Sequence, residues 1–221
     1  MDRECHTDKD AYDRTVTDNR ALIQFIRTIG SGDREVAIRQ VAATPELAMA
    51  SLAKGPSKAT SEEFFLDSLS VQVYAGHTAL HVAASAYDVE IASALLSAGA
   101  DLHARNRRGA EPLHAATDGG PGSTRWNPLA QAATITHLLQ AGANLEAIAE
   151  GGITPLHRAV RNRCSMAVRV LLDAGADPYR TNLNGSTAFT LAQWTTGRPG
   201  TGSADAKHEQ AAIVQLIEAA G

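Results

Sequence analysis

The segment from Gly152 to Asp177 reads GITPLHRAVRNRCSMAVRVLLDAGAD, and it recurs with substitutions on both sides of itself. The histidine of its Pro-Leu-His step and the equivalent positions of the other copies are His81, His114, His157 and Thr190. Their spacings of 33, 43 and 33 residues define a 33-residue unit with one ten-residue interruption. The paired aliphatic residues near the end of each copy are 43, 33 and 45 residues apart, which adds a second interruption of twelve residues. This periodicity predicts a stacked array, because no unit of that length buries its apolar face alone.

The residue types that recur in each copy of the unit predict a helix pair. A threonine before the Pro-Leu-His step caps the backbone donors at a helix start, and proline suits the first helical position. The small alanines that follow permit close packing. Gly99, Gly142 and Gly175 supply the left-handed residue that ends the second helix. Each unit is therefore expected to run helix, turn, helix, glycine and extended return.

The complete motif Gly-x-Thr-Pro-Leu-His-x-Ala at residues 152–159 resembles the ankyrin repeat. Relaxed copies begin at Gly76, Gly109 and Gly185, and the closing Leu-Leu-x-x-Gly-Ala-Asp/Asn signature occupies residues 95–101, 138–144 and 171–177. The resemblance spans residues 76–221. It implies a bacterial-type ankyrin repeat protein with two intra-repeat insertions, folded as an all-α solenoid of stacked helix-turn-helix units.

The domain organisation follows from this register. We expect a loose N-terminal arm over residues 1–18, then a helical cap or degenerate repeat plus connector over residues 19–75. Four repeats fill residues 76–221, with insertions near 119–128 and 196–209. In the connector, Thr60-x-x-Glu63 predicts a capping box that opens a short helix, and Ser70 to Tyr74 are expected to be extended.

Composition restricts the class of protein. The chain has 221 residues, 44% of them apolar and 5% aromatic, so its core is expected to consist mostly of Ala, Leu, Ile and Val. Cys5 and Cys164 form no plausible disulfide framework or metal set, which favours a reducing compartment. No apolar run approaches the roughly 20 residues that span a bilayer, and the first residues lack a secretory signal. We therefore expect a cytoplasmic protein without a membrane partner.

The charge distribution argues against nucleic-acid binding. The formal net charge is -4, and residues 76–185 contain nine arginines, no lysine and nine acidic residues. Nucleic-acid binders usually present a net basic domain, and this chain does not.

The motif histidines His81, His114 and His157 superficially suggest a metal or catalytic triad. They occupy equivalent positions of separate units, so they are expected to form a ladder and not to converge on one point. The resemblance implies that they are hydrogen-bonding structural residues. No cofactor and no metal is predicted.

Partner contacts in ankyrin-like stacks come from the hairpin tips and the exposed end of the first helix of each unit. Carried over by register, these positions are Tyr74, His77, Ser85, Arg107, Arg108, Asp118, Glu150, Ile153, Arg161, Asn162, Leu183, Asn184 and Trp194. Within the set, Arg107, Arg108 and Arg161, together with Arg163, suggest a basic strip that suits carboxylates or phosphates. Trp126, in the first insertion, is either an anchor for its loop or a binding residue.

The leading hypothesis is that the chain is a non-enzymatic scaffold that binds another protein through its concave face and hairpin tips. The expected partner is a protein with an acidic segment. An alternative is a small-molecule or catalytic site between the two insertions, for which the acid, base and nucleophile candidates are Asp118, Asp205, His208, Glu209 and Cys164. Residues 197–203 are similar to a phosphate-binding loop but lack its Gly-Lys-Ser/Thr ending, so a flexible linker is favoured. A third hypothesis is that the inserted loops dimerise the protein; the sequence leaves the oligomeric state open.

Overall fold

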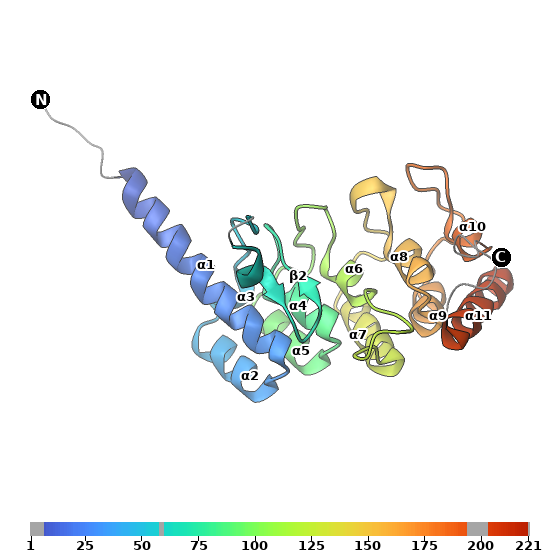
Figure 1. Cartoon of the computed structure of the whole chain (residues 1–221), viewed down its shortest axis with the longest axis horizontal. Coiled ribbons are helices and arrows are strands. Elements are labelled where there is room, and N and C mark those ends of the chain that lie inside the picture. The colour runs from blue at the N-terminus through green and yellow to red at the C-terminus, as the bar shows by residue number, and fades with distance from the viewer. Residues whose placement is uncertain (1–6, 58–59, 194–202, 221) are drawn as a thin grey trace, which may run out of the picture.

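The computed structural model describes residues 7–57, 60–193 and 203–220, with the backbone alone for residues 7–18. Cys5 and Trp194 lie outside these described residues. Helices pair and stack in two rows (Figure 1). The first row contains α1 (Thr7–Ser31), α4 (Ala79–Ala86), α6 (Pro112–Ala116), α8 (Pro155–Arg161) and α10 (Ala188–Gln193). The second row contains α2 (Arg34–Ala43), α5 (Val89–Ser97), α7 (Pro128–Gln140), α9 (Ser165–Asp173) and α11 (Ala204–Ala220). The predicted all-α repeat solenoid is confirmed.

Helix starts and ends follow the predicted capping chemistry. In α4, the hydroxyl oxygen of Thr78 accepts a hydrogen bond from the backbone N–H of His81 at 3.4 Å, and Thr154 caps α8 in the same way. The second helix of the first repeat ends at a left-handed Gly99 (φ 92°), after which the N–H of Ala100 bonds to the carbonyl of Leu95 at 2.9 Å. Glycine is suited to this cap because a side chain disfavours positive φ.

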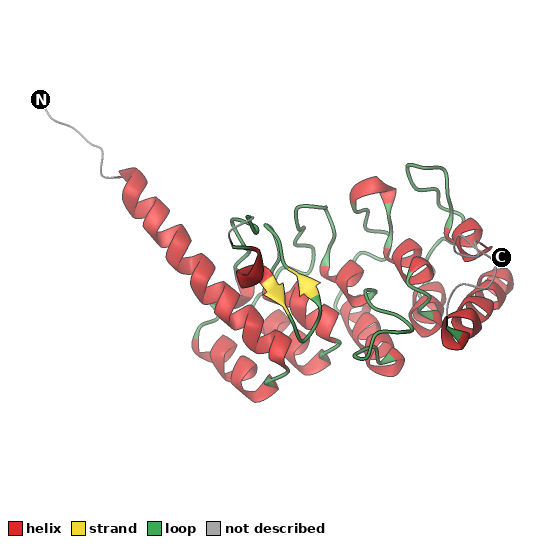
Figure 2. Ribbon diagram, in the orientation of Figure 1, coloured by secondary structure: helices red, strands yellow, loops and turns green. Residues whose placement is uncertain are grey.

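Small and aliphatic side chains build the core. Residues 79–85 of α4 are all buried, and alanines occupy three of these positions. Because alanine has a minimal side chain, α4 packs closely against both α1 and α6. In the four repeats, the first-row helices are shorter than their second-row partners, which leaves a concave side from which the connecting hairpins extend (Figure 2).

The N-terminal helices pack on the first repeat as one further helix pair. Four side chains of α1 are almost completely buried: Leu22, Phe25, Ile26 and Ile29. Arg34 of α2 pairs with Asp88 at 2.9 Å and with Glu90 at 2.8 Å, which joins α2 to α5.

The prediction of a loose arm over residues 1–18 is wrong for residues 7–18, because α1 begins at Thr7. Once a packed helix has formed, each added residue fixes little more and gains a backbone hydrogen bond, so the helix extends beyond its packed part. Residues 1–6 lie outside the described residues.

The connector differs from its predicted capping box. After the short α3 (Glu46–Met49), a 3-10 turn, η1 (Ser61–Phe64), leads into a hairpin of β1 (Phe65–Leu66) and β2 (Val71–Gln72), drawn in yellow in Figure 2. The Thr60 hydroxyl does not cap η1; it accepts instead from the N–H of Ser57 at 3.1 Å. Of the segment predicted to be extended, Val71 and Gln72 form β2, whereas Ser70 is a left-handed turn residue (φ 50°).

The first insertion is shared between a loop and a helix, and the described part of the second is mostly helical. Residues 117–127 form the loop between α6 and α7, and the remaining extra residues lengthen α7 to 13 residues, compared with nine in α5 and α9. Residues 204–209 of the second expected insertion are helical and belong to the 17-residue α11. Residue 203 of that insertion directly precedes α11. Residues 196–202 of the insertion lie outside the described residues, as do residues 194 and 195.

The motif histidines form the expected ladder between neighbouring units. The Nε2 atoms of His81, His114 and His157 lie 2.9, 3.0 and 3.2 Å from the carbonyl oxygens of Ala110, Ile153 and Ser186. Each Nδ1 is contacted by a backbone N–H from the start of its own helix, so Nδ1 accepts and the proton resides on Nε2. Each neutral ring therefore links its helix start to the following unit.

Thr190 shows what the fourth unit retains of this arrangement. Its hydroxyl accepts from the N–H of Thr187 at 2.8 Å and donates to the carbonyl of the same residue at 3.0 Å. The local contact at the helix start is thus preserved, while the shorter side chain bonds within its own unit.

Burial holds the ladder in its neutral form. It lowers the pKa of His81 to about 3 and that of His114 to about 4, and it also lowers the pKa of His157. An unfolded histidine has a pKa of about 6.5. The stabilisation that depends on neutral rings is therefore fully present above pH 6.5 and is lost as the pH falls through the lower, folded-state values.

We predict that the free energy of unfolding falls between pH 6.5 and pH 4.5, and that His114→Gln makes this dependence shallower. Each histidine that is neutral when folded contributes a slope of about 1.4 kcal/mol per pH unit in this interval. Urea unfolding at several pH values measures the slope. His208→Gln, which replaces an exposed histidine of α11, is the control and should leave it unchanged. An unaltered slope in His114→Gln would contradict the neutral ladder.

Candidate partner-binding site on the concave face

A polar cavity of about 550 Å³ opens on the concave side across the first three repeats. We call it the concave groove. Its lining combines residues of the hairpins with residues at the ends of the first-row helices. The polar and charged members are Gln72, Tyr74, His77, Ser85, Asn106, Arg108, Asp118, Glu150, Arg158, Arg161 and Asn162.

Backbone hydrogen bonds between neighbouring hairpin tips hold one side of this groove. They connect Arg107 N to Ala75 O at 2.9 Å, Glu150 N to Arg108 O at 2.7 Å and Leu183 N to Gly151 O at 2.9 Å. Because main-chain atoms make these bonds, the side chains at the tips vary without loss of register. The tips therefore form a fixed frame for side chains of differing chemistry.

Arg158, on the first-row helix α8, is the central cation of the groove. Its Nη1 lies 3.3 Å from Oδ1 of Asp118 and 3.4 Å from the carbonyl oxygen of His114, and its side chain is 24% exposed. Both contacts are long for charge-assisted hydrogen bonds, which are typically about 2.7–2.9 Å. A guanidinium carries five N–H donors, and only Nη1 is used in these contacts. Asp118 and the carbonyl of His114 thus orient the guanidinium of Arg158 on one side, while its other side is accessible to solvent.

Asp118 is the acid that accompanies Arg158. Its side chain keeps 38% of its surface exposed at the groove opening, while protein atoms surround it on the other sides. Burial raises the pKa of the Asp118 carboxyl, and the positive charges of Arg158 and Arg125 oppose that rise. Apart from histidine, the charged side chains of the lining are three arginines and two acidic residues, Asp118 and Glu150. The groove is therefore net positive although the whole chain is net negative.

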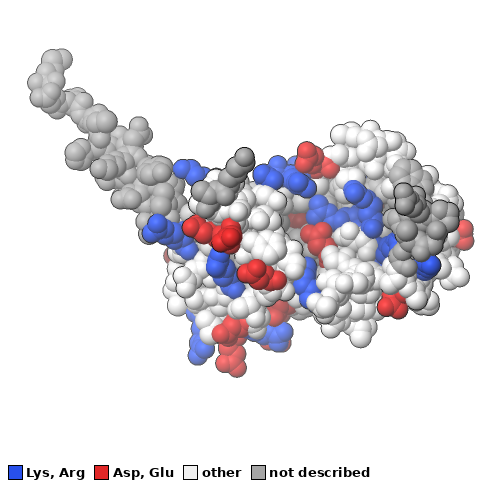
Figure 3. All heavy atoms as spheres, in the orientation of Figure 1, with Lys and Arg blue, Asp and Glu red and all other residues white. Residues whose placement is uncertain are grey.

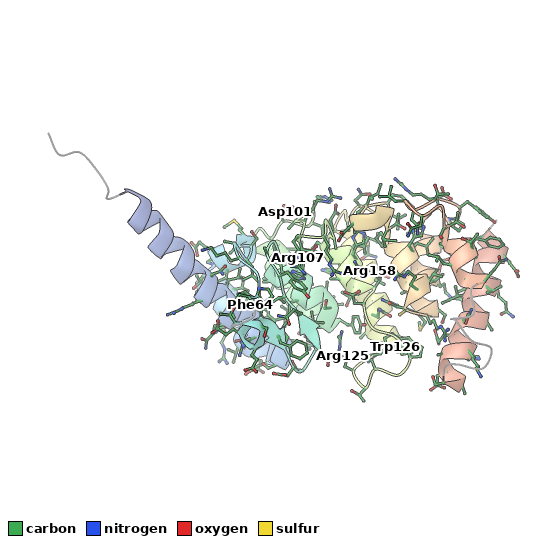
Figure 4. All side chains as sticks on the ribbon, turned by 45° about the horizontal axis from the view of Figure 1, so that its top comes forward. Phe64, Asp101, Arg107, Arg125, Trp126 and Arg158 are labelled. Carbon is green, nitrogen blue, oxygen red and sulfur yellow. The ribbon has the colours of Figure 1, made fainter. Side chains whose placement is uncertain are left out.

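At the other end of the groove, Tyr74 and His77 pack together. The guanidinium of Arg107 lies 3.7 Å from the centre of the Tyr74 ring, within the range of a cation–π contact. Burial lowers the pKa of His77 to about 4, so this ring is neutral at physiological pH. Figure 4 shows Arg107 and Arg158 along this side of the molecule, and Figure 3 shows basic side chains in a band across the same region.

The structure brings most predicted binding residues together. Tyr74, His77, Ser85, Arg108, Asp118, Glu150, Ile153, Arg161 and Asn162 all line the groove. Arg107 lies over Tyr74 instead, Leu183 is an exposed hairpin tip, and Asn184 and Arg163 line a second cavity beside the groove. Trp194 is outside the described residues.

Sequence reasoning missed three polar residues of the groove lining, Gln72, Asn106 and Arg158, and of these Arg158 is the charged one. It follows the motif histidine directly, at a position filled by Val82, Ala115 and Leu191 in the other units. A charged residue at a position that is otherwise apolar was a visible signal of a specialised role.

The loop of the first insertion packs on the stack by hydrogen bonds to a buried glutamine. Gln131 of α7 is completely buried; its side-chain nitrogen donates to the carbonyls of Ala116 and Asp118, at 3.0 and 3.2 Å. Its side-chain oxygen accepts from Nε1 of the half-buried Trp126 at 2.9 Å. The Tyr87 hydroxyl also donates to the carbonyl of Asp118. These contacts fit the interpretation of Trp126 as an anchor, and Figure 4 shows it beside Arg125 in this loop.

Of the five residues of the catalytic alternative, only Asp118 lines the groove, and none lines the second cavity. Cys164 is buried beneath the loop, where its thiol contacts the carbonyl of Gly119 at 3.3 Å, and burial raises its pKa to about 12. Glu209 accepts from the backbone N–H of Ser165 at 2.8 Å at the start of α9. Asp205 and His208 are exposed on α11, whereas Asp118 lies in the groove. A protonated, buried thiol is a poor nucleophile.

The described residues contain no group of three or more His, Cys, Asp or Glu side chains arranged to hold a metal ion. Within the same part of the chain, no helix has the length and apolar character needed to cross a bilayer.

Helix pairs stacked in two rows, with hairpins extending from one side, define a repeat solenoid. Comparison with known protein families identifies the type of repeat. A model described as Ankyrin repeat matches residues 75–107, and one described as Ankyrin repeats (many copies) matches residues 138–192. The residues that these two models match are ankyrin repeats, and they place this part of the chain in the ankyrin repeat family. The interval between the two matches contains the first insertion. A search of curated proteins finds no match to the chain.

Proteins of this family are generally modules for protein–protein interaction and generally are not enzymes.

We predict that Gln131→Leu lowers the free energy of unfolding by about 2 to 4 kcal/mol, because buried carbonyls and the Trp126 N–H lose their partner. Chemical unfolding monitored by circular dichroism measures the change. Gln140→Leu is the matched control, since Gln140 is exposed at the end of the same helix and its replacement should change stability by less than about 0.5 kcal/mol. Equal stabilities of the two variants would refute the anchoring role of Gln131.

Proposed function

We propose that this chain is a non-enzymatic scaffold that binds a segment of another protein in the concave groove and along the hairpin tips. The observation that carries the proposal is the gathering of nine predicted contact residues around one cavity, although they come from three repeats. Backbone bonds between the tips and the histidine ladder make this surface rigid before binding. A preformed surface spends little conformational entropy on binding, which favours affinity.

The charges of the groove support an acidic partner segment. Arg108 and Arg161 are exposed, and Arg158 is accessible between them and Asp118. Arginine binds carboxylates in a planar, bidentate geometry and is enriched at the energetic centres of interfaces. The opposite net charges of groove and partner would also accelerate association at low salt.

The inserted loop gives less support to the alternative of a pocket between the insertions. Two side chains of this loop point toward the stack: Arg125 donates to the carbonyl of Ser85 at 2.7 Å, and Trp126 packs against the core. The loop therefore braces the stack beside the groove, and the groove itself remains the candidate site.

We predict that the double variant Arg108→Glu, Arg161→Glu lowers the affinity for a partner captured with the wild-type chain by roughly tenfold or more, because two attractive charges become repulsive. Affinity capture identifies the partner, and calorimetry with the purified partner measures the change. The melting temperature should remain nearly unchanged, since both side chains are exposed.

Arg169→Glu provides the control for this experiment. Arg169 is an exposed arginine of α9, in the second row and away from the groove lining. Its reversal changes the net charge without altering the groove, so affinity should be retained. Equal losses in the control and the double variant would indicate a nonspecific charge effect and contradict the proposal.

A further inference from the structure

We propose that the partner segment carries an acidic residue and a large apolar residue three positions apart, and that these bind in two adjoining cavities on either side of α8. The inference rests on the proposed function, because it specifies the chemistry of the segment that the same face binds.

The second cavity lies between α8 and α10 and has a volume of about 550 Å³. Its walls are largely apolar and include Val160, Leu191, Ala192 and Ile213. Val160, Ala192 and Ile213 are each at most 4% exposed, so the walls belong to the fixed core of the stack. Such a cavity suits an aliphatic or aromatic side chain, because binding would remove from water the apolar surface of that side chain and of the partly exposed Leu191 and Ile153.

The two cavities adjoin each other. Ile153 and Arg161 line both, which places these two side chains on the boundary between the concave groove and the second cavity. A segment that lies in the groove and passes over α8 therefore reaches the second cavity without leaving the surface. The polar groove and the apolar cavity select different side chains of that segment.

The repeat register sets the distance between the two recognition points. Arg158 and Leu191 follow the motif position of the third and fourth units, at His157 and Thr190, and so are equivalent residues one unit apart. Arg158 lines the groove and Leu191 lines the second cavity. Neighbouring packed helices have axes about 8–10 Å apart, so the backbones at these two equivalent positions are separated by about that distance, which we take as the spacing of the two recognition points.

That separation matches one periodicity of an extended peptide. A polyproline II segment has three residues per turn and rises about 3.1 Å per residue, so residues i and i+3 lie on the same side, about 9 Å apart. In a β-strand, side chains on the same side are separated by about 6.6 Å or about 13 Å. The geometry therefore favours an acidic and an apolar residue at i and i+3 of a polyproline II segment, in either order along the chain.

The acidic residue of the segment would contact the unused donors of Arg158. Since Arg158 reaches Asp118 and the carbonyl of His114 through Nη1 alone, a carboxylate approaching through the groove opening binds without displacing Asp118. Arg161 on the boundary adds a second positive charge between the two points. An acidic group is thereby directed to the groove, and the apolar residue is directed to the neighbouring cavity.

The test is selection of peptides from a phage-displayed random twelve-residue library on the full chain. We expect the selected peptides to share Asp or Glu three positions from Leu, Ile, Phe or Trp. One selected peptide, synthesised with a fluorescent label, is then titrated with the chain variants by fluorescence polarisation.

Arg158→Gln should weaken binding about tenfold or more, because the carboxylate loses its charged partner. Leu191→Gln should weaken it about threefold to tenfold, because the second cavity becomes less apolar. The matched controls are Arg169→Gln on α9 and Leu129→Gln on α7, which replaces a leucine that is 69% exposed and lines neither cavity. Both controls should bind as the wild type does.

Changes in the peptide make the test independent of protein folding. A peptide with alanine at the acidic position should no longer respond to Arg158→Gln, and one with alanine at the apolar position should no longer respond to Leu191→Gln. One glycine inserted between the two positions should weaken binding to the level of the single alanine peptides. If Leu191→Gln lowers the melting temperature, the peptide substitutions decide the outcome.

The outcomes separate this inference from the proposed function. Peptides that respond to Arg158→Gln but tolerate alanine at the apolar position or the inserted glycine would overturn the two-cavity inference and leave the proposed function standing. Peptides that respond neither to Arg158→Gln nor to the Arg108→Glu, Arg161→Glu double variant would overturn both. Absence of any selected peptide would also count against both.

Discussion

The hydrogen bond from a buried histidine to a carbonyl of the following unit is the interaction on which the rest of the structure depends. It occurs at His81, His114 and His157, and in each case the same ring accepts a backbone N–H from its own helix start. One side chain thus fixes both the beginning of a helix and the distance to the next unit. Since the ring must be neutral and correctly protonated to do so, its burial is part of the arrangement.

The candidate site is a consequence of this fixed spacing. Hairpin tips bonded through their main chains and first-row helices held in register place side chains of three repeats around one groove. Specificity then resides in the positions that the frame leaves variable, of which Arg158 and Leu191 are the clearest pair. The frame and the recognition residues are separable, so the surface chemistry changes without disturbing the stack.

Much of the fold was predictable because its signals are periodic. The repeat motif, the capping threonines, the closing glycines and the histidine ladder each act within one unit or between neighbours, so their positions in the sequence fix their positions in space. The helical extension of α1 over residues 7–18 was not predictable from apolar periodicity, because a helix propagates beyond its packed part.

The site was predictable only in part. Register predicted that Tyr74, Arg108 and Arg161 lie on one face, because equivalent positions of a repeat share a face, and all three line the groove. The inward packing of Trp126 depends on Gln131, five residues later in an insertion without a repeat equivalent, so the sequence left two interpretations open. The pairing of Arg158 with Asp118 joins residues of different units across the groove, and a pattern search within one unit does not detect it.

The most direct test of the account is NMR spectroscopy of the histidine side chains in the ¹⁵N-labelled protein. We expect the rings of His81, His114 and His157 to be neutral at pH 6, with the proton on Nε2 protected from solvent exchange and coupled to the carbonyls of Ala110, Ile153 and Ser186. Rings that titrate near pH 6.5, with Nε2 protons in rapid exchange with water, would contradict the ladder and the groove that its spacing creates.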